Sequence, residues 1–425
     1  MKMLFLKAVF TLLLIAVTSC SPSHQQTPAH PQPGPVPTPS AMPVQAPAVP
    51  VESSASDSPG QDDDFEFETA DETPAPQSLS EFNFFRDMAG QVPRDDVVPY
   101  GLNTEHFADY ARVRRFVRVP AGAHVQYDED AALDFPVGTV FLQTFSYPLD
   151  RRDPASKEQY VETRMLRRLT GGWDGVSYIW NKEGSDARRA LAGGIVAVSW
   201  TGDDGAPHSL KYVVPNKNDC KRCHENQGVM LILGPTVANL NGDYPYAEGS
   251  ENQIRHWSAR GILQGAPDNA DDAPRLARWD DPNDGPVDVR ARAWLDVNCA
   301  HCHNPLGAGG VSGLDLRLAQ DSPIRLGVYK PPVAAGRGSE GQQFSIEPGK
   351  PQSSFLIGRL ISTDPSVMMP PVGRRLPNSE AIALVGEWIA GMRFDESEAQ
   401  QLREKQLELL EQIKREGKWP ETVPE

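Results

Sequence analysis

The pattern of hydrophobic and polar positions divides the chain into a β-rich part followed by segments with helical periodicity. Between about residues 115 and 215, short runs rich in β-branched and aromatic residues predict strands. Gly-Asp-Asp-Gly at 202–205 predicts a hairpin turn between the last two. Their regular spacing favours a small sandwich-like domain over 81–215. The predicted strands are Phe116–Val119, Val125–Tyr127, Thr139–Tyr147, Val176–Asn181, Ile195–Thr201 and Leu210–Val214.

After about residue 216, apolar positions recur mainly at helical spacing, and long loops separate them. Helices are predicted over Val289–Val297, Ser353–Leu360 and Ser379–Met392, and a charged helix over 396–416 carries a short leucine stripe that suits docking on the body. We therefore expect a multidomain α+β fold. Its parts are a β-rich N-terminal sandwich-like domain (81–215), two mostly α-helical domains (216–288 and 289–395), and a charged C-terminal helix and tail (396–425).

The first eighty residues have a different character. Two lysines precede the apolar run Ala8–Val17, which is too short to span a bilayer and is typical of a signal peptide. Val17-Thr18-Ser19-Cys20 resembles a bacterial lipoprotein cleavage box, which predicts residues 1–19 as a signal peptide and lipidation of Cys20. The alternative is an ordinary signal peptide with an incidental cysteine. Residues 20–80 are rich in Pro, Ser and Ala, which predicts a disordered tether.

Composition narrows the class of partner. The chain of 425 residues has a formal net charge of −16, which makes nucleic acid an unsuitable partner. Of its five cysteines, four lie in two short motifs, described next. No segment after residue 20 is apolar enough to predict a membrane span.

The two motifs are Cys-Lys-Arg-Cys-His at 220–224 and Cys-Ala-His-Cys-His at 299–303. Two thiols three residues apart lie on one side of a helical turn, so both can add to the vinyl groups of one porphyrin. The histidine that follows then faces the iron as the proximal ligand. The motifs therefore predict two covalent c-type haems, one on Cys220, Cys223 and His224, and one on Cys299, Cys302 and His303.

Other interpretations of the same cysteines compete. Paired Cys-x-x-Cys units can form a zinc site, and a single unit can form a redox dithiol or a disulfide. The histidine at the same offset in both units favours haem. His301 occupies a variable position inside the second motif, where a surface role is expected.

The sequence predicts one axial ligand opposite the histidine clearly for the second haem, and leaves several candidates for the first. In Met-Met-Pro-Pro at 368–371, Met369 is the expected ligand of the second haem, with Met368 as second choice. For the first haem, Met230 and His256 are equal candidates. A ligand from the β-rich part, such as Met165, and an open coordination site are further alternatives.

The residues resemble a known family. The Cys-x-x-Cys-His, Met-Pro-Pro and Trp-Ile arrangement over 290–392 resembles a class I cytochrome c domain, and residues from about 80 to 395 resemble an uncharacterised bacterial family of diheme c-type cytochromes. The resemblance implies two covalent haems, a β-rich N-terminal part and a possible parallel β-helix protein as partner. It supplies no substrate. Segments that carry it include Phe135-Pro136-Val137-Gly138-Thr139, Gly172-Trp173, Gly234-Pro235, Leu295-Asp296-Val297-Asn298 and Pro331-Pro332-Val333-Ala334-Ala335-Gly336.

Three functions are compatible with these observations. The first is a lipid-anchored electron carrier that relays single electrons between a donor and an acceptor redox protein on the periplasmic side of the cell envelope. The outer membrane is favoured, because Ser21 stands where inner-membrane lipoproteins have Asp. The second is a diheme peroxidase-like enzyme with an open site at the first haem, for which Glu225 is a candidate acid–base group. The third is a redox subunit of a larger complex.

Overall fold

The computed structural model describes residues 74–129, 132–226, 228–333 and 337–416. All of them belong to one compact unit. The predicted signal peptide, Cys20 and nearly all of the predicted tether lie outside the described residues. Within the described part, no helix has the length and apolarity that crossing a bilayer requires.

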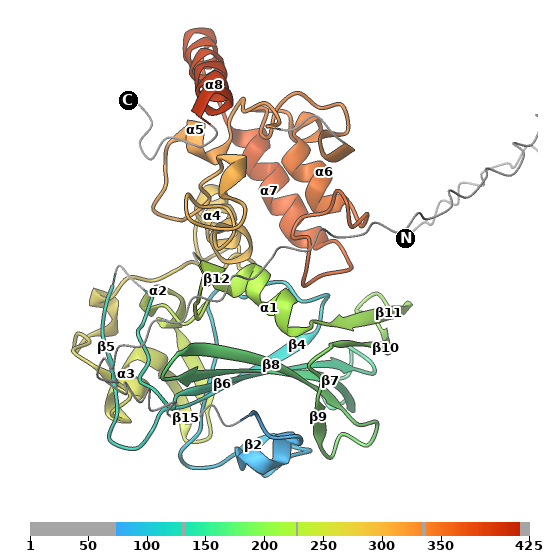
Figure 1. Ribbon diagram of the computed structural model, residues 1–425, viewed down its shortest axis with the longest axis vertical. Coiled ribbons are helices and arrows are strands. Elements are labelled where there is room, and N and C mark those ends of the chain that lie inside the picture. Colours follow the sequence, from blue (N-terminus) through green and yellow to red (C-terminus); the bar gives the residue numbers. More distant parts are fainter. Residues whose placement is uncertain (1–73, 130–131, 227, 334–336, 417–425) are drawn as a thin grey trace, which may run out of the picture. The chain divides into compact units, whose positions relative to one another are not determined.

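A six-stranded antiparallel sheet forms the centre of the β-rich part (Figure 1), with the strand order β3-β4-β6-β7-β8-β9. Nearly every residue of β6 is buried, because elements cover both faces of the sheet at this strand. The sheet therefore has two packed sides, and one of them faces the cysteine motifs. The strands are β3 Val98–Tyr100, β4 Arg112–Arg118, β6 Val140–Pro148, β7 Glu158–Leu169, β8 Gly172–Trp180 and β9 Ala187–Arg189.

Two small units pack on this sheet. The hairpin of β10 (Gly194–Thr201) and β11 (Pro207–Val214) has the predicted turn at 202–205, where Gly205 adopts φ +77°. Its Trp200 and Tyr212 join a core with Phe145 and Tyr147. The second unit consists of the 3-10 helix η1 (Leu79–Phe82) and the strand pair β1 (Phe85–Asp87) and β2 (Val92–Pro93). It shares a second core with Leu142, Met165 and Val176 of the sheet.

The segment 216–288 is not the mostly helical domain that the sequence predicted. Its helices are short, and strand pairs interrupt them. Val125 of β5 (Val125–Gln126) pairs in parallel with Leu263 of β16 (Leu263–Gln264). The remaining elements are α1 Lys217–His224, β12 Glu225–Asn226, β13 Val229–Met230, α2 Val237–Leu240, β14 Asp243–Tyr246, β15 Gly249–Asn252, α3 Gln253–Ala259 and η2 Ala270–Asp272.

The physical reason for this error lies in the core. Leu240, Ile254 and Trp257 share one core with Tyr100 and Phe141 of the sheet region. Apolar spacing does not reveal which partner an amphipathic segment will find. The β-rich region therefore continues to about residue 265, and segment 216–288 forms no independent helical core.

The C-terminal part has its own core but is also less helical than predicted. The predicted helices are present as α4, α6, α7 and α8, and Trp388 and Ile389 of α7 are buried in the core. Long irregular connections separate them, so two mostly α-helical haem domains are not seen and the predicted fold class is wrong. Apart from the six-stranded sheet, the sheets of the described residues have two strands each, so these residues do not form the predicted sandwich. The elements are α4 Val287–Leu295, η3 Asp296–Ala300, η4 Gly310–Ser312, α5 Pro323–Leu326, η5 Arg337–Ser339, η6 Pro351–Ser353, α6 Phe355–Ile361, α7 Ser379–Gly391 and α8 Glu396–Glu416.

Candidate functional site

The first motif occupies the last turns of α1, which lies across the sheet at β8 (Figure 1). The Asn216 side chain begins the helix by accepting hydrogen bonds from the amides of Asn218 and Asp219, and the Asp219 carboxylate accepts one from the amide of Asn216. This capping box fixes where the helical register starts. Cys220 and Cys223 then lie one turn apart, and the helix ends at His224.

Gly175 of β8 makes room for this helix. A Cβ atom at Gly175 would lie 2.9 Å from Cε of Met230 and 3.7 Å from Cβ of Cys220. A side chain at this position would therefore occupy space that the first motif now uses.

The second motif follows α4 through a π-helical turn over Asp296–Ala300. The amide of His303 donates to the carbonyl of Cys299 over 2.8 Å, and the amide of Cys302 donates to the same oxygen over 3.1 Å. π turns of this kind are frequent at functional sites. Gly309 packs against the His303 ring, since a Cβ atom there would lie 2.9 Å from Nδ1.

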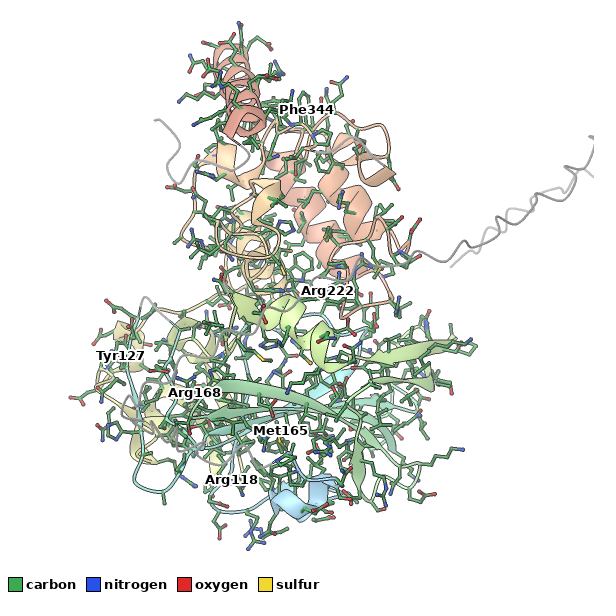
Figure 2. All side chains as sticks on the ribbon, viewed as in Figure 1. Arg118, Tyr127, Met165, Arg168, Arg222 and Phe344 are labelled. Carbon is green, nitrogen blue, oxygen red and sulfur yellow. The ribbon has the colours of Figure 1, made fainter. Side chains whose placement is uncertain are left out.

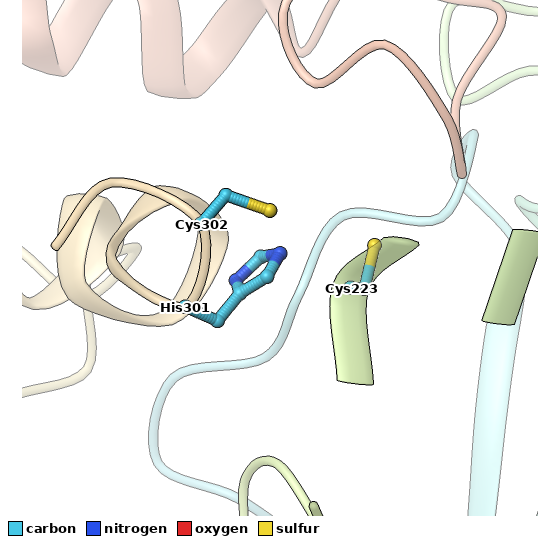
Figure 3. Close-up of side chains that lie close together, drawn as sticks. All are labelled: Cys223, His301 and Cys302. Atoms are coloured by element: carbon cyan, nitrogen blue, oxygen red, sulfur yellow. The ribbon is translucent and has the colours of Figure 1, made fainter. Parts of the chain in front are cut away.

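The two motifs touch each other (Figure 3). The thiol of Cys302 donates to the backbone carbonyl of Arg222 over 3.6 Å. The ligand atoms of Cys223, His301 and Cys302 all lie within 4.8 Å of one another. His301 is partly exposed and lies where the motifs meet.

Both proximal-ligand candidates have the same hydrogen-bond arrangement. Nδ1 of His224 is 2.8 Å from the carbonyl oxygen of Leu231, and Nδ1 of His303 is 2.9 Å from Oγ of Ser312. A partner at Nδ1 leaves Nε2 as the metal-binding nitrogen. Burial lowers the pKa of each histidine to about 4, so both rings are neutral near pH 7.

Three of the four motif cysteines have the properties of thiols, not of activated thiolates. Burial raises the pKa of Cys220 to about 11 and that of Cys299 to about 12. The pKa of Cys223 is raised to about 12 by its hydrogen bond with the Cys302 sulfur and by burial. Redox dithiols depend on a lowered thiol pKa, which these three cysteines lack. Cys302 differs, because its hydrogen bond with Cys223 lowers its pKa. All four are free cysteines.

A cavity of about 420 Å³ lies between the sheet and the C-terminal part. Cys220, Cys223 and His224 of the first motif line it, whereas the second motif contributes Ala300 and His301 and not Cys299, Cys302 or His303. Its size falls in the range of cofactor sites. Trp294 of α4 also lines the cavity, and its buried Nε1 has no hydrogen-bond partner within the described residues. An unpaired buried donor beside an apolar cavity fits a ligand that carries carboxylate groups, as haem does. The cavity, the Cys220 and Cys223 thiols and the oriented His224 imidazole fit c-type haem at the first motif.

The β3–β4 connection, residues 101–111, joins the sheet to the C-terminal part. The amide of Phe107 donates to Oδ1 of Asn298 over 2.8 Å, just before the second motif. Asp109 accepts from the amides of Arg375 and Leu376, over 2.6 and 2.8 Å, in the loop that follows Met369. One loop of the β-rich part is thereby fixed to both sides of the second site.

The predicted axial ligands are placed differently. Met230, Met369 and Met165 line the cavity. His256 does not: its Nδ1 is 2.8 Å from Glu251, and its ring stacks on Tyr246 with centroids 3.6 Å apart. Met165 is 1 % exposed and packs in the core on the sheet face that covers Leu142 and Val176 (Figure 2).

The structure adds three residues to the site that sequence reasoning missed. His106 of the β3–β4 connection, Arg164 of β7 and Trp294 all line the cavity. Arg164 pairs with the fully buried Glu162 over 3.1 Å and lies over the Phe145 ring. No motif marks His106 or Arg164, because their proximity to the cysteines is created by the sheet. Trp294 was identifiable from its place one helical turn before the second motif.

Comparisons with known proteins add no identity. No protein-family model, curated protein or solved structure matches the chain.

Proposed function

We propose that this protein is a diheme c-type cytochrome that carries single electrons between redox proteins. The observation that carries the proposal is the direct contact of two Cys-x-x-Cys-His motifs at the edge of one cavity, with the sulfur atoms and the imidazole of Cys223, Cys302 and His301 within 4.8 Å of one another. Two haems attached through these sulfurs would have their edges close together. Closely spaced haems favour transfer of an electron from one to the other within the chain.

The residues of the chain would set the properties of this pair. When bound, each haem supplies a ferric–ferrous couple that takes up and releases one electron. His224 and His303 present Nε2 because Leu231 and Ser312 occupy Nδ1. The apolar cavity walls limit access of water, and axial ligands tune the potential.

Anchoring and partners belong to the same proposal. Lipidation at Cys20 and a tether to about residue 80 would hold the described part on the periplasmic side of the outer membrane. The donor and acceptor would be redox proteins, and a parallel β-helix protein is one candidate.

The proposal is tested on protein matured in a host that attaches c-type haem. We expect intact-mass measurement to find two added haems per chain, and metal analysis to find iron but no zinc. The double variants Cys220→Ala/Cys223→Ala and Cys299→Ala/Cys302→Ala should each retain one haem. A matured chain with free thiols or bound zinc would contradict the proposal.

A peroxidase is the second candidate, and a specific observation favours it. His106 and Arg164 line the cavity beside the first motif, and an imidazole with a nearby guanidinium can move protons and stabilise charge. Addition of peroxide to the reduced protein, with a reductant supplied, separates the candidates. A carrier oxidises slowly and without turnover, whereas an enzyme consumes peroxide repeatedly.

A further inference from the structure

His106 lines the cavity beside the first motif. It belongs to the β3–β4 connection and lines the same cavity as Cys220, Cys223 and His224. The edge of its ring packs against Phe145, with centroids 6.2 Å apart. Within the described residues, neither ring nitrogen has a hydrogen-bond partner. His106 is half-buried, and an imidazole at the cavity wall with both nitrogens unpaired is available to bind a ligand there.

Hydrogen bonds on both sides of His106 hold its backbone in place. Oγ1 of Thr104 donates to the carbonyl of Ala277 over 2.6 Å, and the amide of Thr104 donates to Oδ1 of Asn239 over 2.9 Å. On the other side, Asn298 accepts from the amide of Phe107. A side chain whose neighbours are fixed in this way is preorganised for ligation.

The competing ligands of the first iron are less well placed. His256 is engaged by Glu251 and Tyr246 away from the cavity. Met165 also borders the cavity, but its side chain is 1 % exposed and packs in the core with Leu142 and Val176. Met230 pairs with Glu225 in the β12–β13 hairpin, whose next residue, Leu231, binds Nδ1 of His224. Met230 therefore lies on the proximal side of the site.

His106 also belongs to the first site and not to the second. The cavity that His106 lines is bordered by Cys220, Cys223 and His224, whereas Cys299, Cys302 and His303 are not among its lining residues. The Met369 amide donates to the carbonyl of Arg359 over 2.9 Å, which keeps that methionine at the second site.

We propose that His106 is the second axial ligand of the first haem iron, opposite His224. This inference rests on the proposed function, because it requires a haem on Cys220 and Cys223. It assigns histidine–histidine ligation to the first haem, while Met369 is the expected ligand of the second. Methionine ligation raises the potential relative to histidine. Electrons would therefore pass from the first haem to the second.

The test uses the full matured chain and the variants His106→Ala, His106→Met and His256→Ala. Electron paramagnetic resonance of the oxidised protein should show two low-spin haems in the wild type and in His256→Ala. In His106→Ala one of the two should become high-spin, bind carbon monoxide when reduced, and return to low spin on addition of free imidazole. His106→Met should keep a low-spin first haem with a higher potential.

The outcomes separate the two proposals. A chain without attached haem contradicts the proposed function itself. A chain with two haems whose spectrum is unchanged in His106→Ala, or whose wild type already has a high-spin first haem, overturns the assignment of His106. If His106→Ala yields too little protein, the potential of the first haem in His106→Met decides: no change in that potential overturns the assignment.

Discussion

The thiol of Cys302 donates a hydrogen bond to the backbone carbonyl of Arg222, a residue inside the other cysteine motif. The sequence places these residues far apart and in separate predicted domains. The structure brings them together because α1 lies on the sheet and the π turn after α4 meets its C-terminal end. The motifs thus form the two halves of one site, with the β3–β4 connection as the third element.

The first prediction concerns His301, which lies between the motifs. His301→Ala is expected to keep two haems per chain, because the residue occupies a variable position of the attachment motif and a haem-bearing Cys302 needs only Cys299 and His303. His303→Ala is the matched control and should lose the native spectrum of the second haem. Intact-mass and absorption measurements check both. In a zinc site, His301 would be one of three protein ligands, so loss of bound zinc from His301→Ala would support that interpretation instead.

The second prediction concerns the space that Gly175 provides. In Gly175→Leu the new side chain would enter the region of Met230 and Cys220, where an added Cβ already lies 2.9 Å from Met230 Cε. We expect haem content to fall from two toward one per chain, with the loss confined to Cys220 and Cys223 in a peptide map. Gly171→Leu is the control, because no atom lies within 4 Å of an added Cβ there. Equal haem content in the two variants would contradict this role of Gly175.

Hydrophobic periodicity predicted individual elements better than their assembly. The helix α8 has the predicted bounds, and the β10–β11 hairpin turns where Gly-Asp-Asp-Gly predicted it. Strand β7 was missed, since its charged Glu162 and Arg164 do not resemble a central strand; they are tolerated because they pair with each other and with Tyr212.

The candidate site was predictable only where chemistry is local in sequence. The cysteines and adjacent histidines form a fixed spacing, so the sequence identified them. His106 has no such pattern, and its place beside His224 depends on how the sheet positions the β3–β4 connection. For the same reason, sequence could not reveal that His256 pairs with Glu251 away from the cavity.

The third prediction is a pH-dependent contribution of Asp174, which holds the start of α1 to the sheet. Its carboxylate accepts from Arg167 over 2.6 Å and from Lys217 over 2.7 Å. Burial by itself would raise the pKa of Asp174, but these two cations outweigh it and lower the pKa below its usual 3.8. A lowered carboxylate pKa stabilises the fold above the unfolded-state value, and this stability is lost as pH falls through the folded-state value.

Asp174→Asn should therefore lower the free energy of unfolding by about 1–3 kcal/mol at pH 7, and the difference from the wild type should shrink as the pH falls below 3.8. Urea unfolding across that range measures it. The control is Asp203→Asn, whose side chain is 73 % exposed and pairs with Arg151, so a change below about 1 kcal/mol is expected. A difference that stays constant with pH would show that Asp174 does not act through its charge.

The fourth prediction separates the two methionines of the loop before α7. Met368 is 2 % exposed and buried, whereas Met369 lines the cavity, and Arg374 holds it there by donating to its carbonyl over 3.0 Å. Met369→Leu keeps the volume but removes the thioether. It should abolish the far-red absorption of methionine-ligated ferric haem, make the second haem high-spin and allow carbon monoxide to bind to it. Met368→Leu should leave all three properties unchanged, because its side chain serves packing. If instead Met368→Leu removed the far-red band and Met369→Leu kept it, the ligand would be Met368, and the loop would have to present its buried residue to the iron once haem is attached.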